Sequence, residues 1–298
     1  MKIMSKYDIP SIEFNLSHIC NLKCANCDHL SPYFSAKNNN EFIDYEKFLR
    51  QITVLTKHAR VNSFSFLGGE PLLKKDIVKY LKAVKDTGIC KKLVLVTNGF
   101  LLPKMHEEAY KYLDEISVST YPSPLLDRES LKVVEKTCRK HNVNIEYHRH
   151  DYFCYNVVSK EIQNSKLVHK IFMTCSLAWK QHCYTLFDNK ISRCSRLPFM
   201  NLKLVERGCI ESDFIESDCL EIIDSSDFAE RLREYLESDT PLQSCRYCLG
   251  SVGKWVKQKQ LTPKEVADEI WTEVTPNGSI NWIKLYRKLI KRKLFKKI

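Results

Sequence analysis

Short apolar or alternating runs and helical patterns follow one another through the first half of the chain. The runs that predict β-strands are Ile12–Leu16, Asn62–Leu67, Lys92–Thr97, Glu115–Thr120 and Val143–His148. The stretches with apolar residues at helical spacing are roughly 44–59, 74–87, 103–112 and 127–141. Because strands that alternate with helices run parallel and are joined by right-handed crossovers, the pattern predicts an α/β fold whose parallel sheet is open or closed into a barrel.

The second half of the chain has a different pattern. Tyr184–Phe187 and Lys190–Arg193 are short runs on either side of Asp188 and Asn189, a pair that tolerates the positive φ of a hairpin turn. The regular alternation of strand and helix does not continue beyond this hairpin. We therefore expect a domain boundary near residues 165–172.

Positive charge is concentrated at the C-terminal end. The protein has 298 residues and a formal net charge of +11, and residues 279–298 contain eight cations and no acid. The apolar residues at helical spacing between these cations are Trp282, Tyr286, Leu289, Ile290, Leu294 and Ile298. This pattern predicts a basic amphipathic helix, which either packs its apolar stripe on the barrel or contacts an anionic membrane or a phosphate-bearing substrate. Nucleic acid is not expected as a partner, because the rest of the chain is nearly neutral.

The sequence shows no signal for secretion or membrane insertion. Its N-terminus, MKIMSKYDIP, is too polar for a signal peptide, and no run of about 18 apolar residues occurs. We therefore expect a cytoplasmic protein whose thirteen cysteines are reduced. In such a compartment, patterned cysteines bind metal more often than they form disulfides.

Residues with useful chemistry follow the predicted strands, at the ends where parallel α/β folds carry their sites. Those that follow or lie on the five strands in turn are Cys20, Cys24 and Cys27; Gly68, Gly69 and Glu70; Thr97 and Asn98; Ser117 and Ser119; and His148, Arg149, His150 and Asp151. Three thiols lie close together in the first group, and the next cysteine along the chain is Cys90. Since zinc sites and ordinary iron–sulfur clusters take four ligands, either a distant residue completes the set or one metal position stays open.

The order of these motifs resembles the radical S-adenosylmethionine (radical SAM) superfamily over roughly residues 10–150. CxxxCxxC follows the first strand, GGEP the second and TNG the third. The resemblance implies a partial (β/α) barrel of five to six parallel strands, a 4Fe-4S cluster held by Cys20, Cys24 and Cys27, and S-adenosylmethionine on its open iron. It also implies that the cofactor is bound by Gly68, Gly69, Glu70, Thr97, Asn98, Ser117 and Ser119. Asn26 stands where the family usually has an aromatic residue, so Tyr33 or Phe34 is expected to hold the adenine instead.

A second set of cysteines, Cys175, Cys194, Cys245 and Cys248, resembles the auxiliary-cluster domain called SPASM, or its shortened form, twitch. Because no cysteine follows Cys248, the resemblance implies one auxiliary 4Fe-4S cluster. Four thiolates also suit a zinc ion, which stays the alternative. Cys183 is a second candidate for the position of Cys175, since the hairpin would place it opposite Cys194.

Together these features predict three regions: a radical SAM partial barrel (1–168), a twitch-like iron–sulfur domain (169–260) and a basic helical tail (261–298). The expected function is hydrogen abstraction from a small polar, sugar-like or aminocyclitol-like substrate, with the auxiliary cluster as electron acceptor. An external one-electron reductant such as flavodoxin or ferredoxin would serve it, and the substrate could carry a phosphate or nucleotide.

The sequence leaves open a second function and the identity of the catalytic base. The alternative function is a peptide-modifying maturase or a radical epimerase that uses a cysteine as hydrogen donor, for which Cys154 is the candidate. His148 and Arg149 are the first choices for the catalytic base, ahead of His29, His150 and Asp151, because they follow the last clear strand.

Overall fold

A computed structural model describes residues 6–36, 44–267 and 276–295. The strands are β1 (Tyr7–Ser17), β2 (Ala59–Gly68), β3 (Cys90–Thr97), β4 (Glu115–Thr120), β5 (Asn144–Arg149), β6 (Tyr152–Cys154), β7 (Tyr184–Phe187), β8 (Lys190–Ser192), β9 (Cys219–Glu221) and β10 (Trp255–Lys257). The α-helices are α1 (Ser31–Ala36), α2 (Tyr45–His58), α3 (Ile77–Thr87), α4 (Arg128–Lys140), α5 (Ser165–Met173), α6 (Leu197–Glu206), α7 (Ile215–Asp218), α8 (Phe228–Glu237), α9 (Pro263–Ala267), α10 (Pro276–Ser279) and α11 (Trp282–Phe295). Shorter helical turns are η1 (Pro71–Leu73), η2 (Leu102–Lys104), η3 (Glu107–Lys111), η4 (Leu177–Gln181) and η5 (Gln243–Tyr247).

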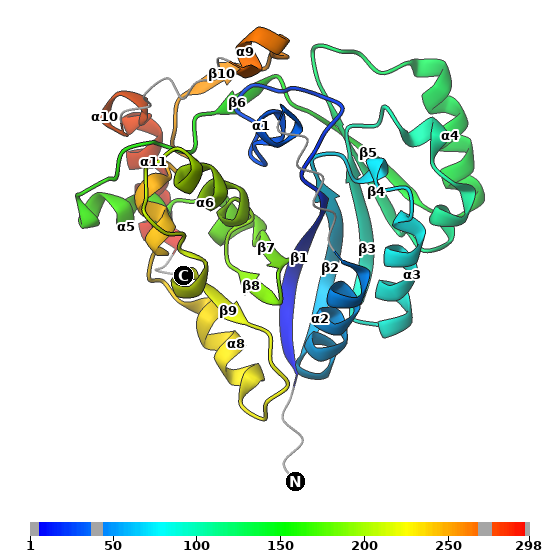
Figure 1. Ribbon diagram of the computed structural model, residues 1–298, viewed down its shortest axis with the longest axis horizontal. Coiled ribbons are helices and arrows are strands. Elements are labelled where there is room, and N and C mark those ends of the chain that lie inside the picture. The colour runs from blue at the N-terminus through cyan, green and yellow to red at the C-terminus, as the bar shows by residue number, and fades with distance from the viewer. Residues whose placement is uncertain (1–5, 37–43, 268–275, 296–298) are drawn as a thin grey trace.

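The parallel sheet predicted from the sequence is confirmed. Its strands lie in the order β5-β4-β3-β2-β1-β7-β8-β9, and β1 to β5 and the β1–β7 pair are parallel. Helices α2, α3 and α4 cover one face of this sheet, and the strands end on the side where α1, β6 and β10 lie (Figure 1). The predicted strand ends therefore meet along one edge, as a partial barrel requires.

Local signals explain where the helices begin and end. The side chain of Asp127 accepts a hydrogen bond from the backbone N–H of Ser130 and thereby caps α4. Gly88 ends α3 in the left-handed conformation, with φ of 62°. Asp188 and Asn189 also have positive φ, and they form the predicted hairpin turn between β7 and β8.

One predicted helix is absent. Residues 103–112 form the separate 3₁₀ turns η2 and η3 in place of a continuous α-helix. His106 lies between them in an extended conformation, and its side chain caps η3 by accepting from the N–H of Glu108. The apolar spacing in this stretch therefore reflects two short turns that pack on the core, and a second start signal interrupts the helix that the spacing suggested.

The residues after 170 extend the same sheet. β7 pairs in parallel with β1, and β8 and β9 continue from it as antiparallel strands. A separate two-stranded ribbon, β6 with β10, joins residues near 153 to residues near 256. The division of the chain at 168 and 260 stays a prediction, and a continuous sheet crosses the first of these boundaries.

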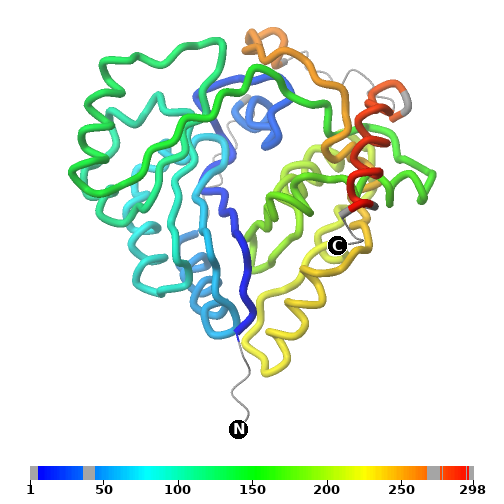
Figure 2. Tube along the Cα trace, turned by 180° about the vertical axis from the view of Figure 1, so that it is seen from behind, coloured from blue at the N-terminus to red at the C-terminus, as the bar shows by residue number. Residues whose placement is uncertain are grey.

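Two main groups of buried residues support this arrangement. The larger lies around the sheet and includes Phe14, Phe48 and Phe66. The smaller lies under the C-terminal helix and includes Val158, Leu249 and Leu285. Helix α11 packs beside α5 over this second core (Figure 2). Within the described ranges, no helix combines the length and apolar character that crossing a bilayer requires.

Candidate active site

A cavity of about 500 Å³ lies at the strand ends. Its walls come from the loop after β1, the ends of β2, β3 and β4, the β6 region and the C-terminal part of the chain. Cys20, Cys24 and Cys27 line it together with Gly68, Gly69, Thr97, Asn98 and Ser119. The structure thus brings most of the sequence-predicted cofactor residues to one hollow, although they come from four different strands.

The three thiols of the first loop are close enough to influence one another. Burial is the main cause that raises the pKa of Cys27 to about 11, and the neighbouring Cys24 raises it further. Burial also raises the pKa of Cys20, and both other thiols of the group add to that effect. A cluster of thiols this buried is costly to ionise alone, whereas a bound metal group would stabilise the thiolates.

Hydrogen-bond donors point at two of these sulfur atoms. The Sγ of Cys20 accepts from the backbone N–H of Leu22 at 3.3 Å and from the Asn98 amide at 3.5 Å. The Sγ of Cys24 accepts from the amides of Gln260 at 3.1 Å and Gln258 at 3.5 Å. Donors to sulfur favour the thiolate, which is the form that binds metal.

The C-terminal part of the chain holds the cysteine loop in place. Residues 259–261 run beside the loop and form backbone hydrogen bonds from Ala25 N–H to the Lys259 carbonyl and from Leu261 N–H to the Lys23 carbonyl. The Gln260 side chain also accepts from Lys23 N–H at 2.7 Å. Sequence reasoning missed this strap, because Gln258 and Gln260 carry no motif that connects them to residues more than 230 positions earlier.

The paired glycines allow the second strand to meet the cysteine loop. A Cβ on Gly69 would lie 2.0 Å from the Ile19 carbonyl oxygen, and one on Gly68, whose φ is +142°, would lie 2.3 Å from that of Ser17. The backbone N–H groups of Gly69 and Glu70 donate to these same two carbonyls. Both glycines are therefore required for a close backbone approach, and both also line the cavity.

Glu70 lies beneath the cavity lining. Its side chain is fully buried, and its carboxylate accepts from the Thr97 hydroxyl at 2.8 Å, the Asn98 N–H at 2.9 Å and the Leu72 N–H at 3.1 Å. Burial outweighs these three donors and raises the pKa of Glu70 to about 7. The carboxylate therefore joins the GGEP turn to the end of β3, and its predicted contact with the methionine amino group stays a prediction.

Glu70→Gln is expected to remove a pH dependence of stability. Because the folded-state pKa is above the ordinary value of 4.5, the protonated form stabilises the folded protein, and this stabilisation is lost as pH rises toward about 7. The shift corresponds to ~3 kcal/mol of unfolding free energy. Urea unfolding measured between pH 4.5 and about 7 should show that the unfolding free energy of wild type falls by this amount relative to that of Glu70→Gln. Glu129→Gln, an exposed glutamate on α4, is the control, and parallel curves for wild type and Glu70→Gln would refute the assignment.

The remaining cofactor candidates separate into two groups. Thr97, Asn98 and Ser119 line the cavity, whereas Ser117 does not. Thr97 and Asn98 are nearly fully buried, and the Asn98 amide also donates to the Asn21 side chain at 2.7 Å. Asn98 therefore connects the TNG motif directly to the cysteine loop. Ser117 lies two residues earlier on β4, away from the strand end.

The two first-choice bases do not line the cavity. His148 is exposed and pairs with Glu146 on the same strand, and Arg149 is exposed and pairs with Asp151. His29 and His150 do line the cavity, although His150 is also exposed to solvent. Burial lowers the pKa of both, to about 4 for His29. These two histidines were weighed from the sequence, but a position beside a strand end could not show which ring faces inward.

Aromatic side chains form part of the cavity wall. The rings of Tyr121 and Phe153 stack at 6.2 Å, and His150 lies beside both of them. Burial and the three nearby thiols raise the pKa of Tyr121, which places its ring close to the cysteine loop. Tyr33 and Phe34, predicted to hold the adenine, instead pack with Phe199 in a separate small core.

The second set of cysteines gathers around a smaller cavity of about 30 Å³. Its lining includes Cys175, Cys194, Cys245 and Cys248. Burial is the largest cause that raises the pKa of Cys245, and the other three thiols raise it further. Cys183 does not line the cavity, because its thiol forms a hydrogen bond with the carboxyl group of Glu13. Among the described residues, no three His, Cys, Asp or Glu side chains are arranged to hold a single metal ion.

An ion pair connects the two cavities. The Arg196 guanidinium is 5% exposed, lines both cavities and donates to the carboxylate of Asp28, at 2.9 Å and 3.1 Å. It also donates to the Gly250 carbonyl at 3.0 Å and lies 3.9 Å from the Cys248 sulfur. Asp28 follows Cys27 directly, so this one side chain reaches from the first cysteine set to the second. No pattern in the sequence indicated this role for Arg196.

The fold is that of an α/β protein, and a cavity at its strand ends is lined by the three thiols of the loop after the first strand. Residues 14–145 match the model of the family described as the Radical SAM superfamily. This part of the sequence therefore matches the radical SAM superfamily, as its motifs indicated.

Curated relatives match less than half of the chain. A protein named "Probable GTP 3',8-cyclase" from Saccharolobus islandicus (strain L.S.2.15 / Lassen #1) is 28% identical over 130 residues, which cover 42% of this chain and 38% of the relative. One of the same name from Saccharolobus solfataricus is 30% identical over 114 residues, which cover 38% of this chain and 35% of the relative. The chain thus spans less than two fifths of the length of these relatives.

Two solved structures are similar at a lower level. BtrN in complex with AdoMet and 2-DOIA is 15% identical with a TM-score of 0.44, and the alignment covers 82% of this chain and 94% of BtrN. anSMEcpe with bound AdoMet and the Cp18Cys peptide is 12% identical with a TM-score of 0.47, and covers 96% of this chain and 98% of that one. Similarity at this level does not bear on the substrate of the chain.

Proposed function

We propose that the chain is a radical SAM enzyme that oxidises a small polar, sugar-like or aminocyclitol-like substrate and passes one electron to an auxiliary iron–sulfur cluster. The observation that carries this proposal is the adjacency of the two cysteine-lined cavities, which share Leu177, Arg196 and Gly250 in their walls. A substrate in the larger cavity would lie between a radical source and an electron acceptor.

The first cysteine set suits a 4Fe-4S cluster with S-adenosylmethionine. Cys20, Cys24 and Cys27 would hold three irons, and the adjoining cavity has room for a cofactor beside them. When bound, these groups would supply a 5′-deoxyadenosyl radical. The chain's own contribution is to fix the sulfur atoms through Asn98, Gln258 and Gln260, and to surround the cofactor with the backbone of Gly68 and Gly69.

The second cysteine set suits a cluster better than a zinc ion. Zinc binds four thiolates at about 2.3 Å, so the sulfur atoms around it must nearly touch. Here the four thiols line one cavity of about 30 Å³, and their resemblance to the twitch domain is what favours a cluster over zinc. A four-iron cluster is larger and needs its thiolates farther apart, and at this position it would accept the electron that the substrate loses.

The proposed oxidation removes one hydrogen atom, one proton and one electron from the substrate. The bound cofactor would take the hydrogen atom and the auxiliary cluster the electron, while a base in the cavity accepts the proton. We assign the base to His150, because it lines the cavity and desolvation lowers the pKa of its imidazole, which favours the neutral form that can accept a proton. An external one-electron reductant of the flavodoxin or ferredoxin type would supply the electron that starts each cycle.

Anaerobic turnover with candidate alcohols, aminocyclitols and nucleotides, GTP included, tests this proposal. Mass spectrometry should find 5′-deoxyadenosine together with a product two hydrogens lighter than its substrate. His150→Gln is expected to lower the rate of product formation by about 10²–10⁴-fold, since that is the usual contribution of a general base. His148→Gln, two residues earlier on β5, is the matched control and should leave the rate unchanged. If His148→Gln lowers the rate and His150→Gln does not, the base is His148, near the end of β5.

A second function has support from one residue. Cys154 lines the cavity, and its thiol contacts the Tyr155 and Gly253 carbonyls at 3.3 Å each. A thiol in this place could return a hydrogen atom to a substrate radical, as an epimerase requires. Turnover in deuterated water separates the cases: a product of unchanged oxidation state that carries one deuterium, lost in Cys154→Ala, would favour the epimerase over the oxidation.

A further inference from the structure

Helix α11 presents to solvent the face that a docked helix normally hides. Ile283, Ile290 and Leu294 are 67%, 59% and 63% exposed, and Tyr286 lies on the same side at 52%. Their spacing of three and four residues places them in one stripe about 17 Å long. Exposed apolar residues usually occur singly, so a continuous stripe marks an interaction surface.

The opposite side of α11 is fixed to the body of the protein by its cations. Lys288 donates to the Ser176 hydroxyl at 2.8 Å and to the Thr174 carbonyl, and Arg292 donates to the Met173 carbonyl at 2.9 Å. Leu285 is fully buried between these contacts. Of the stripe predicted from the sequence, Leu289 packs against the second core, whereas Tyr286, Ile290 and Leu294 are exposed. The first of the two alternatives, in which the whole stripe packs on the protein, therefore does not hold for the described part of the helix, and Ile298 lies outside the described residues.

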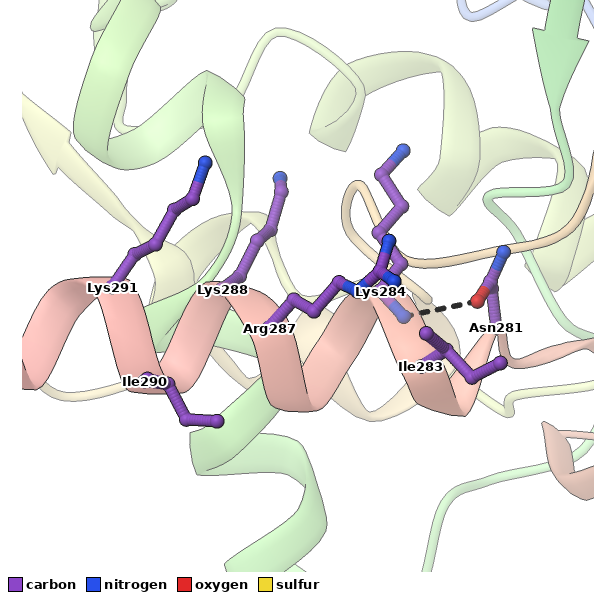
Figure 3. A pocket seen from close by; sticks show the side chains of 7 residues that line it. All are labelled: Asn281, Ile283, Lys284, Arg287, Lys288, Ile290 and Lys291. Carbon is purple, nitrogen blue, oxygen red and sulfur yellow. Dashed lines mark hydrogen bonds between the residues drawn. The ribbon is translucent and has the colours of Figure 1, made fainter.

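Exposed cations border the apolar stripe. Arg287 and Lys291 lie next to it along the helix and are both exposed. The isoleucines leave α11 on one side and Lys284, Lys288 and Lys291 on the other, around a shallow groove (Figure 3). Trp282 and Tyr286 stack at 6.5 Å near the start of the helix. Aromatic side chains of this kind are enriched where proteins meet the polar boundary of a bilayer.

We propose that α11 is an interfacial helix that docks the protein on an anionic lipid bilayer. The stripe would enter the boundary between headgroups and acyl chains, and Arg287 and Lys291 would reach the lipid phosphates. The exposed charge favours this occupant, because Arg287 and Lys291 are exposed beside the stripe and residues 279–298 contain no acid. A second copy of the chain fits less well, because two such faces would bring Arg287 and Lys291 against their own like charges.

This inference is independent of the proposed reaction, but it has a consequence for the cavity. Lys284 lines both the groove on α11 and the large cavity, and its ammonium lies 4.2 Å from the ring centre of Trp255, another cavity residue. Docking through α11 would therefore hold the cavity beside the membrane surface.

Vesicle binding by the intact, anaerobically purified protein tests the proposal. Sedimentation with vesicles of phosphatidylcholine and phosphatidylglycerol should capture the protein at low salt, whereas pure phosphatidylcholine should capture much less. Arg287→Gln combined with Lys291→Gln should lower the partition coefficient roughly thirtyfold, since each surface cation contributes about 1 kcal/mol. Ile290→Asp should lower it at least about tenfold, because it places a charge in the apolar stripe. Val133→Asp, at an exposed apolar position on α4, is the matched control and should bind as wild type does.

Three results would overturn the proposal. The first is an intact protein that does not bind phosphatidylglycerol vesicles at low salt. The second is a protein that self-associates without lipid and becomes monomeric in Ile290→Asp, which would assign the stripe to a second copy. The third is binding to single-stranded RNA that depends on Arg287 and Lys291 but not on Ile290, which would assign the surface to nucleic acid.

Discussion

Replacing Cys20, Cys24 and Cys27 by alanine is expected to abolish cleavage of S-adenosylmethionine. It should also remove about four of the about eight irons per chain that two four-iron clusters contain. These thiols line the large cavity, and donors already point at the sulfur atoms of Cys20 and Cys24. Iron analysis after anaerobic purification and mass spectrometry of 5′-deoxyadenosine measure the two effects, which should occur together.

A control separates loss of the cluster from loss of the fold. Cys138 is a fully buried thiol on α4 that packs in the main core and lines neither cavity. Cys138→Ala should keep all of the iron and the cleavage activity, even if it lowers the melting temperature by a few degrees. Full iron content in the triple variant, or cleavage that persists in it, would show that the first loop does not hold the cluster.

The sheet could be predicted because its signals are local. The period of apolar residues, the cap at Asp127 and the turn at Asp188 and Asn189 each act over a few residues. The failure at 103–112 has a local cause too, since the extended residue His106 and its cap begin a second short turn. Apolar spacing shows which side chains face the core, but it does not show that the backbone between them is one continuous helix.

Only the residues of the site that belong to a sequence motif could be predicted. Cysteines at fixed spacing and the GGEP and TNG turns identified the first loop and the strand ends around it. Arg196 and Gln260 could not be found in this way, because each acts on a cysteine loop far away in the sequence. The sequence could not identify which histidine faces the cavity, for a related reason. His148 and His150 lie two residues apart at a strand end, and only the packing against Tyr121 and Phe153 separates them.

The C-terminal helix shows how an amphipathic pattern can be interpreted in the wrong direction. The sequence separates apolar from charged positions, but it does not say which side faces the protein. Backbone carbonyls at the end of α5, such as those of Met173 and Thr174, supply acceptors that hold Arg292 and Lys288 inward. The apolar stripe is left outside as a result, and its exposure follows from hydrogen bonding elsewhere in the fold.

Cys175→Ala and Cys183→Ala are expected to differ sharply, although both positions were candidates for the same ligand. Cys175 lines the second cavity with Cys194, Cys245 and Cys248, whereas the thiol of Cys183 is hydrogen-bonded to Glu13. Cys175→Ala should therefore lose about half of the iron, because an auxiliary four-iron cluster takes four ligands. Cys183→Ala should keep the full amount.

The activities of these two variants distinguish an electron acceptor from a structural metal. Cys175→Ala should still cleave S-adenosylmethionine, because the first cysteine set is intact, but it should form no oxidised product, since the electron from the substrate has no acceptor. Cys183→Ala should couple cleavage to product as wild type does. Metal analysis of the wild type provides the last check: about four irons with one zinc per chain would identify the second site as zinc and end the electron-acceptor role, because zinc has no redox chemistry. About eight irons, with an extra spectroscopic signal that disappears in Cys175→Ala alone, would establish the acceptor beside Arg196.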